Sequence, residues 1–364
     1  MRIQSIETFQ RDPELAVVRV RTEDGAEGYG QTSAYGADLS TPVLHAMVAP
    51  FFIGKDPWDV DVLAGELVRR TYKFPSSLLL RALCGVDTAI WDLLGKVTGQ
   101  PVHRLLGGRA RDRVPVYASS MSREISPEDE AERLQALVAE QGFLCVKVRV
   151  GAVMGRDRDA SAGRTRRLVP LIRERLGDDI DISADANGAY SPATAIRVGR
   201  LLEEHGYFHY EEPCPYQEVE NTAQVAAALD IPVAGGEQDG VLEQVHRIIE
   251  ARAVDIIQPD IGYIGGMARA RRAAYMAEAA GMPCTPHCAN RSLLQVFTLH
   301  LAAAMPAVSQ YQEWSIEDVP WVHDLFDPVP QVVDGHVELS DEPGWGVEIS
   351  SDFLAAAECR TTST

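Results

Sequence analysis

The feature that most limits the fold is a regular alternation of short apolar runs and amphipathic stretches between Val114 and Trp314. Eight strand candidates alternate with seven helix candidates: VPVYAS, 127–141, LCVKVRV, 161–176, DIDISAD, 192–205, FHYEEP, 218–228, IPVAGGE, 241–252, VDIIQPD, 266–280, MPCTPH, 291–304 and VSQYQEW. Strands that alternate with helices favour right-handed βαβ units and a parallel sheet. Repeated units of this length favour a closed α/β barrel over an open sheet.

The regions on either side of this alternation have a different pattern. Residues 1–30 predict strands, with a hairpin turn at Glu23-Asp24-Gly25, and residues 40–110 predict helices, including a strongly apolar one over 76–95. We therefore predict an α+β domain over 1–115, a barrel over 116–320, and a C-terminal segment, 321–364, that returns to the first domain. Within that segment HVELS is a short strand, and we expect the last six residues, CRTTST, to be disordered.

Composition and charge exclude several classes of partner. A net charge of −19 argues against a nucleic-acid or anionic-membrane surface, since both require a basic face, but it permits a small anionic substrate. The sequence has no apolar run of membrane-spanning length, and MRIQSIETFQ has no signal-peptide core. Six scattered cysteines do not resemble a secreted disulfide framework. We expect a cytoplasmic protein with reduced thiols.

Six chemically active residues end successive strand candidates at nearly constant spacing. They are Asp185, Glu211, Glu237, Asp260, His287 and Glu313, separated by 26, 26, 23, 27 and 26 residues. Each step is one βα unit, so all six side chains are expected at the carboxyl ends of the strands. In a barrel that end is the active-site face.

The first three acids predict a metal site. Carboxylates that converge as closely as Asp185, Glu211 and Glu237 cannot all ionise comfortably without a cation. Oxygen ligands from Asp and Glu favour Mg²⁺ over Zn²⁺ or copper. Taken singly, each acid could be a helix cap or a solvated loop carboxylate. Because the three acids recur once in each βα unit, the metal site is favoured.

The next three residues predict proton chemistry. A carboxylate such as Asp260 beside His287 fixes the imidazole tautomer and raises its basicity, so His287 is the candidate catalytic base. A loop histidine bonded to backbone is the alternative. Glu313 could steady an oxyanion if it is protonated, or bind a substrate hydroxyl; a capping or salt-bridge role is the alternative.

Two cations precede the acids on one strand. In FLCVKVRVG, Lys147 and Arg149 alternate with valines and so point to the same side of a strand. Two buried cations repel each other and cost desolvation, so an anion must balance them. The insertion GAVMGRDRDASAG explains the longer step to Asp185, which leaves both cations facing the acids. The balancing anions would be a substrate carboxylate and the ligand carboxylates; a surface salt-bridge strand is the alternative.

The ordered motifs KVRV, DANG, EEP, GGE, QPD and TPH resemble the enolase superfamily, in its mandelate racemase subgroup. The resemblance implies a modified TIM barrel of the (β/α)7β type with an α+β capping domain built from both termini. It also implies Mg²⁺ bound by Asp185, Glu211 and Glu237, a catalytic pair formed by Asp260 and His287, and homo-oligomers. The implied reaction removes the proton α to a carboxylate and gives an enediolate held by Mg²⁺.

One residue departs from the subgroup's pattern, in which the strand motif is often Lys-x-Lys and the second Lys is a base. Here that position is Arg149, and arginine is a poor general base. We therefore expect proton transfer mainly on the His287 face. Lys147 and Arg149 together could clamp the substrate carboxylate, and the alternative is that Arg149 only screens the ligand carboxylates. A dehydratase that converts a sugar acid or hydroxy acid into a 2-keto-3-deoxy acid is favoured. The alternatives are a racemase, epimerase or cycloisomerase, and a non-catalytic carboxylate-binding relative.

Substrate contacts are predicted less directly. The resemblance implies that the early loop QTSAYGADL closes over the site, which makes Thr32 and Tyr35 candidates; a plain surface loop is the alternative. Asn187 shares the parity of Asp185 and could contact either the metal-ligand sphere or a substrate hydroxyl. Arg291 and Trp314 also lie near strand ends.

Overall fold

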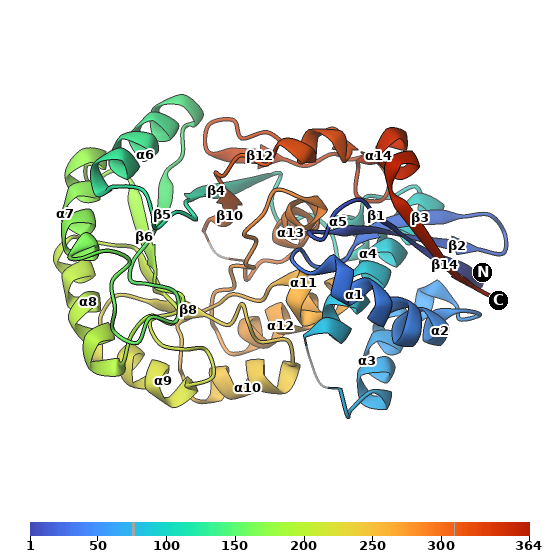
Figure 1. Cartoon of the computed structure of the whole chain (residues 1–364), viewed down its shortest axis with the longest axis horizontal. Helices are drawn as coiled ribbons and strands as arrows, with labels where there is room; N and C mark the ends of the chain where they lie inside the picture. Colours follow the sequence, from blue (N-terminus) through green and yellow to red (C-terminus); the bar gives the residue numbers. More distant parts are fainter. Residues whose placement is uncertain (75–76, 309) are drawn as a thin grey trace.

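The computed structural model describes residues 1–74, 77–308 and 310–364. It consists of an α/β barrel and an α+β capping domain, which lie side by side in Figure 1. The two chain termini lie together at the edge of the capping domain that faces away from the barrel (Figure 1).

The capping domain is built on a four-stranded antiparallel sheet in the order β14-β1-β2-β3. Its strands are β1 (Ile3–Gln10), β2 (Ala16–Thr22), β3 (Glu27–Gln31) and β14 (Glu358–Ser363). Its helical elements are α1 (Ala37–Val43), η1 (Leu44–Val48), α2 (Ala49–Phe52), η2 (Pro57–Asp59), α3 (Val60–Arg70), α4 (Leu78–Thr98) and α5 (Val102–Leu105). The predicted hairpin turn is confirmed, because Gly25 donates its N–H to Thr22 O between β2 and β3.

The apolar helix predicted over 76–95 is α4, although residue 76 lies outside the described residues. Its buried face packs directly on strand β3, and glycine makes this approach possible. A Cβ placed on Gly30 would lie 2.4 Å from the backbone N of Ala89, closer than any real side chain is found. The sheet and the helix therefore meet backbone to backbone.

The barrel sheet runs in the order β10-β4-β5-β6-β7-β8-β9, with parallel pairing throughout this path. Its strands are β4 (Arg113–Ser119), β5 (Cys145–Arg149), β6 (Asp181–Asp185), β7 (His209–Glu211), β8 (Val233–Gly235), β9 (Ile256–Ile257) and β10 (Gln312–Ser315). Its helices are α6 (Pro127–Gln141), α7 (Arg164–Leu176), α8 (Pro192–Glu204), α9 (Val219–Ala228), α10 (Leu242–Glu250), α11 (Ile261–Ile264), α12 (Met267–Ala279) and α13 (Leu293–Ala304). Helices α6 to α10 form the outer arc in Figure 1.

The predicted strand MPCTPH is not a regular strand. Isolated bridges join Cys284 to Ile257 and to Val308, and a further bridge joins Asp260 to His287. Pro283 and Pro286 have no N–H, so this segment cannot form a continuous ladder. It still closes the gap between β9 and the chain that leads into β10.

The chain after the barrel contributes a strand to each part of the molecule. Its elements are η3 (Pro320–Asp324), β11 (Phe326–Asp327), β12 (His336–Glu338), β13 (Glu348–Ile349), α14 (Ser351–Ala356) and the strand β14. The predicted strand HVELS is β12, but it pairs with β4 of the barrel and not with the capping sheet. The expectation that CRTTST is disordered is wrong, because β14 pairs with β1 from Gln10 to Ser5.

No single helix among the described residues is long and apolar enough to cross a membrane; a pair bent by 111°, Ala37–Phe52 with Pro57–Arg70, meets the length and composition criteria only when its members are taken together. All six cysteines carry free thiols. The free thiols agree with the reduced state that we expect from the scattered positions of the cysteines.

A buried carboxylate joins the two parts of the molecule. Asp87 on α4 accepts the N–H of Met267, at 2.6 Å, at the first turn of barrel helix α12. A Cβ on the preceding Gly266 would lie 2.4 Å from the same Asp87 oxygen, so the cap needs glycine there. Burial raises the pKa of Asp87 to about 8, against the opposite effect of the N–H groups of Ala268 and Met267.

This raised pKa predicts how stability depends on pH. The folded protein keeps the Asp87 proton up to about pH 8, whereas the unfolded chain releases it near its ordinary pKa of 3.8. The folded state therefore binds more protons within that window, and its free energy of unfolding falls as the pH rises, by at most about 1.4 kcal/mol per pH unit. Asp87→Asn removes the titrating group and keeps an acceptor for the cap. Urea unfolding at pH 5, 6, 7 and 8 should show a flatter profile for the variant, and parallel profiles would contradict the assignment.

Candidate active site

The carboxyl ends of the barrel strands bring the eight predicted catalytic and metal-binding residues to one mouth. Lys147 and Arg149 lie on β5, Asp185 ends β6, Glu211 ends β7, Glu237 follows β8, Asp260 begins α11, His287 follows the bridged segment and Glu313 lies on β10. All eight side chains are buried. The regular spacing of these residues in the sequence therefore corresponds to a cluster of side chains in the structure.

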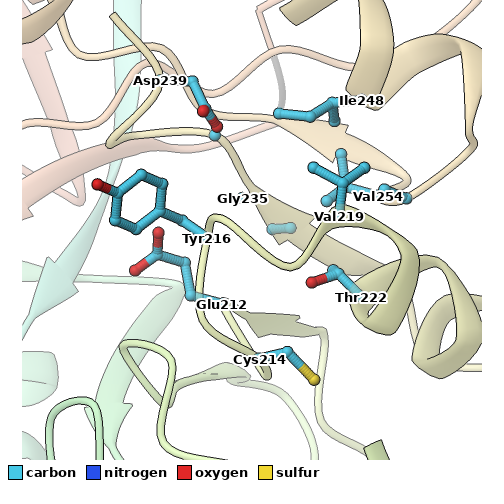
Figure 2. A pocket seen from close by; sticks show the side chains of 12 residues that line it. Glu212, Cys214, Tyr216, Val219, Thr222, Gly235, Asp239, Ile248 and Val254 are labelled. Carbon is cyan, nitrogen blue, oxygen red and sulfur yellow. The ribbon is translucent and has the colours of Figure 1, made fainter. Parts of the chain in front are cut away.

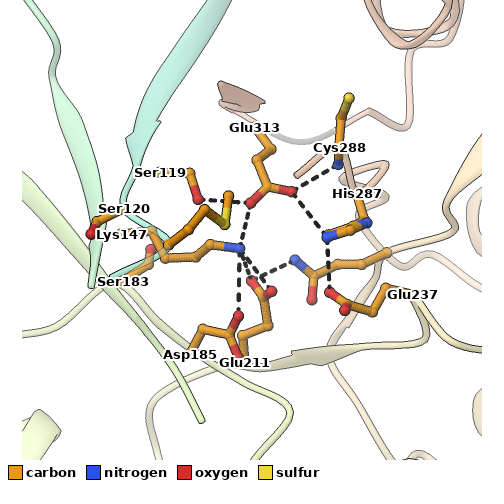
Figure 3. Close-up of polar contacts among 12 residues, drawn as sticks. Ser119, Ser120, Lys147, Ser183, Asp185, Glu211, Glu237, His287, Cys288 and Glu313 are labelled. Carbon is orange, nitrogen blue, oxygen red and sulfur yellow. Dashed lines mark hydrogen bonds and ion pairs between the residues drawn. The ribbon is translucent and has the colours of Figure 1, made fainter. Parts of the chain in front are cut away.

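Lys147 occupies the centre of this cluster (Figure 3). Its Nζ lies 2.8 and 2.9 Å from the two carboxylate oxygens of Glu211 and 2.7 Å from Glu313 Oε1. Asp185 Oδ2 lies further away, at 3.9 Å. Burial alone would raise the pKa of Glu211, but the charge of Lys147, together with His209 and Arg149, outweighs it and holds that pKa well below its ordinary value. The Lys147 ammonium group thus lies close to the carboxylates at the ends of three strands, β6, β7 and β10.

Arg149 faces Asp185 at the edge of the cluster. Its Nη1 donates to Asp185 Oδ2 and, at 3.1 Å, to Asn187 Oδ1. Its Nε donates to the carbonyl of Ser120 at 2.8 Å. These contacts fix the guanidinium in place and direct it to a carboxylate of the cluster.

Asn187 belongs to the same arrangement and not to an open substrate pocket. Its backbone N–H donates to Asp185 Oδ1 at 2.7 Å, and its Nδ2 lies 3.2 Å from Asp185 Oδ2 and 3.3 Å from Glu212 Oε2. Arg123, which sequence reasoning did not identify, donates to Asn187 Oδ1 at 2.8 Å. Of the two roles predicted for Asn187, contact with the carboxylate cluster is the one that this geometry presents.

Asp260 and His287 form a hydrogen-bonded pair on the opposite side. His287 Nδ1 lies 2.7 Å from Asp260 Oδ2, and Asp260 Oδ1 accepts the backbone N–H of Tyr263 at 2.9 Å. The other ring nitrogen, Nε2, faces into the cluster, 3.3 Å from Glu237 Oε2. Burial lowers the pKa of His287, but the charges of Glu237, Glu313 and Asp260 outweigh that effect and raise it to about 10.

Glu313 is surrounded by hydrogen-bond donors. Ser119 Oγ donates to its Oε1 at 2.8 Å, Lys147 lies on the same oxygen, and the backbone N–H of Cys288 donates to its Oε2 at 2.8 Å. Burial acts to raise the pKa of Glu313, but Lys147 and His287 lower it to about 2. The structure therefore holds Glu313 as a carboxylate, and a protonated Glu313 that steadies an oxyanion does not fit.

The donor set agrees with the expected divalent cation. Asp185, Glu211 and Glu237 supply only carboxylate oxygens, which are the ligands that Mg²⁺ prefers. Glu237 Oε2 is buried and accepts no hydrogen bond from any described residue, and His287 Nε2 lies 3.3 Å from it, so this oxygen could bind a cation. Among the described residues, no group of three His, Cys, Asp or Glu side chains is already placed to hold a metal ion. Lys147 and Arg149 lie against two of the three carboxylates and supply positive charge there.

The second glutamate of the EEP motif lies outside this cluster. Glu212 lines a separate small cavity with Cys214, Tyr216 and Asp239, between β8 and the helices α9 and α10 (Figure 2). Burial raises the pKa of Glu212 well above its ordinary value, and the charges of Glu237 and Glu211 add to the effect. Strand parity predicts this difference between Glu211 and Glu212.

Besides Arg123, sequence reasoning missed two further side chains that hold the cluster. Gln258 donates to Glu211 Oε2 at 2.9 Å, and Ser119 donates to Glu313. The parity of the QPD motif could have identified Gln258, because it lies two residues before Asp260 on the same side of the chain.

The remaining predicted substrate contacts lie in three different places. The hydroxyl of Thr32 is bonded to the backbone of Ala16 inside the capping domain, so it is not presented to the mouth. The Arg291 guanidinium lies 5.5 Å from the centre of the Trp314 ring, and both line a separate hollow beside α6. Tyr35 is half exposed on the β3–α1 loop, with φ of 68°.

Comparison with known proteins agrees with this geometry. Residues 3–107 match the model of the mandelate racemase / muconate lactonizing enzyme N-terminal domain, and residues 129–353 match that of the enolase C-terminal domain-like family. L-talarate/galactarate dehydratase of Salmonella typhimurium is 32% identical over 92% of this chain and 80% of its own length. Further relatives are named as dehydratases of arabinonate, xylonate and galactonate.

Several solved structures cover the whole of this chain. A putative racemase from Roseobacter denitrificans has a TM-score of 0.97 and 50% identity, with 100% of both chains covered. A mandelate racemase/muconate lactonizing protein from Paracoccus denitrificans, complexed with magnesium, has a TM-score of 0.91 and 31% identity, covering 100% of this chain and 98% of that one. The chain therefore belongs to the mandelate racemase/muconate lactonizing enzyme family of the enolase superfamily.

Proposed function

We propose that this protein is a Mg²⁺-dependent dehydratase that converts a sugar acid or hydroxy acid into a 2-keto-3-deoxy acid. The observation that carries the proposal is the asymmetry of the mouth. His287, held by Asp260 at 2.7 Å, is a proton-transfer group on one side, whereas on the other side Arg149 is bound to Asp185 and Asn187. The dehydratase names of several relatives support the same reaction.

The proton chemistry follows from this asymmetry. A cation bound by Glu237 would offset a charge that raises the pKa of His287, so that the imidazole could lose its proton. Its free Nε2 would then take the proton α to the substrate carboxylate, while Asp260 keeps the Nδ1–H oriented throughout. The β-hydroxyl then leaves as water after it receives a proton from His287 or from another acid, and the resulting enol becomes the 2-keto acid. Only one base is required, whereas a racemase requires a base on each face of the α-carbon.

The charges of the cluster fit an anionic substrate. We propose that Asp185, Glu211 and Glu237 hold Mg²⁺, with Glu313 keeping Lys147 in place. Bound there, the metal would supply positive charge where negative charge develops as the α-proton is lost. Lys147 and Arg149 add two fixed positive charges on the same strand. The site would therefore bind the carboxylate end of a small molecule.

A racemase or epimerase is the second candidate, because the 50% identical structure is named a putative racemase. In that reaction Lys147 would act opposite His287. Epimerisation conserves the mass of the substrate and dehydration does not, so the product distinguishes the two.

Metal binding is tested without any substrate. Mg²⁺ should raise the melting temperature of the wild type, by an amount equivalent to about 2.7 kcal/mol at one hundred times the dissociation constant. Glu237→Gln should lose most of this effect, because it replaces a proposed ligand carboxylate. Glu130→Gln is the matched control, since Glu130 is an equally buried glutamate on α6 and bonds Arg133 there. Equal Mg²⁺ effects in both variants would contradict the ligand assignment.

The reaction is tested by incubating the protein with Mg²⁺ and a library of mono- and diacid sugars, with 2-keto acids detected by a carbonyl reagent. His287→Asn should lower the rate on the best substrate by about 10²–10⁴-fold, which is the usual contribution of a general base. His246→Asn is the control, because His246 lies exposed on α10. No keto acid, with α-deuterium appearing in a substrate of otherwise unchanged composition, would favour the racemase instead.

A further inference from the structure

Arg81 joins the capping domain to the barrel immediately beside the proposed active site. From helix α4, its Nη1 donates to Ser33 Oγ at 2.6 Å and to Ala34 O at 3.0 Å. The Ser33 N–H in turn donates to Arg81 O at 3.3 Å. The Arg81 guanidinium also lies 3.8 Å from the centre of the Tyr263 ring on barrel helix α11. One side chain thus contacts both the β3–α1 loop and the barrel.

Tyr263 continues this contact to the catalytic pair. Its backbone N–H donates to Asp260 Oδ1 at 2.9 Å, and its ring lies 6.1 Å from the His287 ring between centres. The capping loop packs directly on the same turn: a Cβ added to Gly262 would lie 3.0 Å from both Ser33 Oγ and Asp260 Oδ1. The loop, Tyr263 and Asp260 therefore form one packed unit.

The loop that Arg81 holds has a constrained conformation. Tyr35 and Gly36 adopt φ angles of 68° and 78°, and a bulky residue rarely enters this region unless its surroundings enforce it. The Tyr35 N–H is held by Glu14 O at 2.8 Å. Burial raises the pKa of Tyr35, with further contributions from Glu14, Cys288 and Asp260.

We propose that Arg81 is a positioning residue that locks the Ser33–Gly36 loop against Tyr263, so that Tyr35 and the Asp260–His287 pair keep a fixed relation to bound substrate. The proposal rests on the proposed function, because it assigns Arg81 a role in that site. Arginine suits the position, since its planar group can donate two hydrogen bonds on the loop side while it stacks on an aromatic ring. Lysine could keep the charge but not this combination.

The kinetic test uses the best substrate of the dehydratase assay. Arg81→Met should lower kcat/KM by about 10–100-fold, the usual effect of removing a group that orients a residue in direct contact with a metal or substrate. Tyr263→Leu should cause a similar loss, and the double variant should be within about threefold of the worse single one, because both act through one contact. Arg81→Lys should recover part of the loss.

Arg19→Met is the matched control. Arg19 also pairs with an acceptor, Glu7 at 2.5 Å, and lies 4.9 Å from the centre of the Phe9 ring, but within the capping sheet. It should lower the melting temperature about as much as Arg81→Met while kcat/KM stays at the wild-type value. An equal loss of kcat/KM in both variants, an unchanged kcat/KM in Arg81→Met, or multiplicative losses in the double variant would each overturn the proposal.

A second readout needs no substrate. Hydrogen–deuterium exchange of the Mg²⁺-treated full chain should be faster in Arg81→Met, at both 33–39 and 260–266, than in the wild type or Arg19→Met. Unchanged exchange at either segment would overturn the proposal that Arg81 locks the loop against Tyr263. If the wild type turns over no sugar acid, the dehydratase proposal fails, whereas the exchange experiment still decides whether Arg81 locks the loop to the barrel.

Discussion

The buried ammonium group of Lys147 is the contact on which the arrangement of the site depends. It lies in a low-dielectric interior between Glu211 and Glu313, and its side chain is fully excluded from solvent. Removing one partner of such a group typically costs about 3–5 kcal/mol, because the other charge stays buried and unpaired. β5, β7 and β10 must therefore bring their ends to one point. A closed barrel does this, whereas in an open sheet with the same strand order β7 and β10 would lie four strands apart.

The sequence predicted the barrel and the position of the acids because the βα repeat sets both. A side chain that ends one strand recurs one unit later, so a spacing of 26 residues carries Asp185 to Glu211 and on to Glu237. Strand parity likewise separates Glu211 from Glu212, which lines another cavity. The same pattern failed over 282–287, because apolar residues there suggest a strand while Pro283 and Pro286 remove two of its donors.

The contacts that the sequence did not predict join residues far apart in the chain. Asp87 caps a helix that begins 180 residues later, and β14 becomes ordered by pairing with β1 at the opposite end of the chain. Neither contact has a local pattern, since a lone Asp inside an apolar helix and a Thr-rich terminus are each compatible with several outcomes. The contacts of the β3–α1 loop were likewise not predictable from a local sequence pattern. Thr32 turns its hydroxyl to Ala16, and the neighbouring Ser33 contacts Arg81.

Lys147 and Arg149 begin as equivalent cations on one side of a strand, and the structure gives them different tasks. The compact ammonium fits the barrel centre, where three carboxylates approach a single point. The planar guanidinium of Arg149 lies two residues further along β5, where its separate nitrogens donate to Asp185 and to the Ser120 carbonyl. A lysine at 149 could release a proton, but it could not make both contacts in the same plane. Arg149 therefore holds Asp185 in a fixed position, which supports the proposed proton transfer on the His287 face.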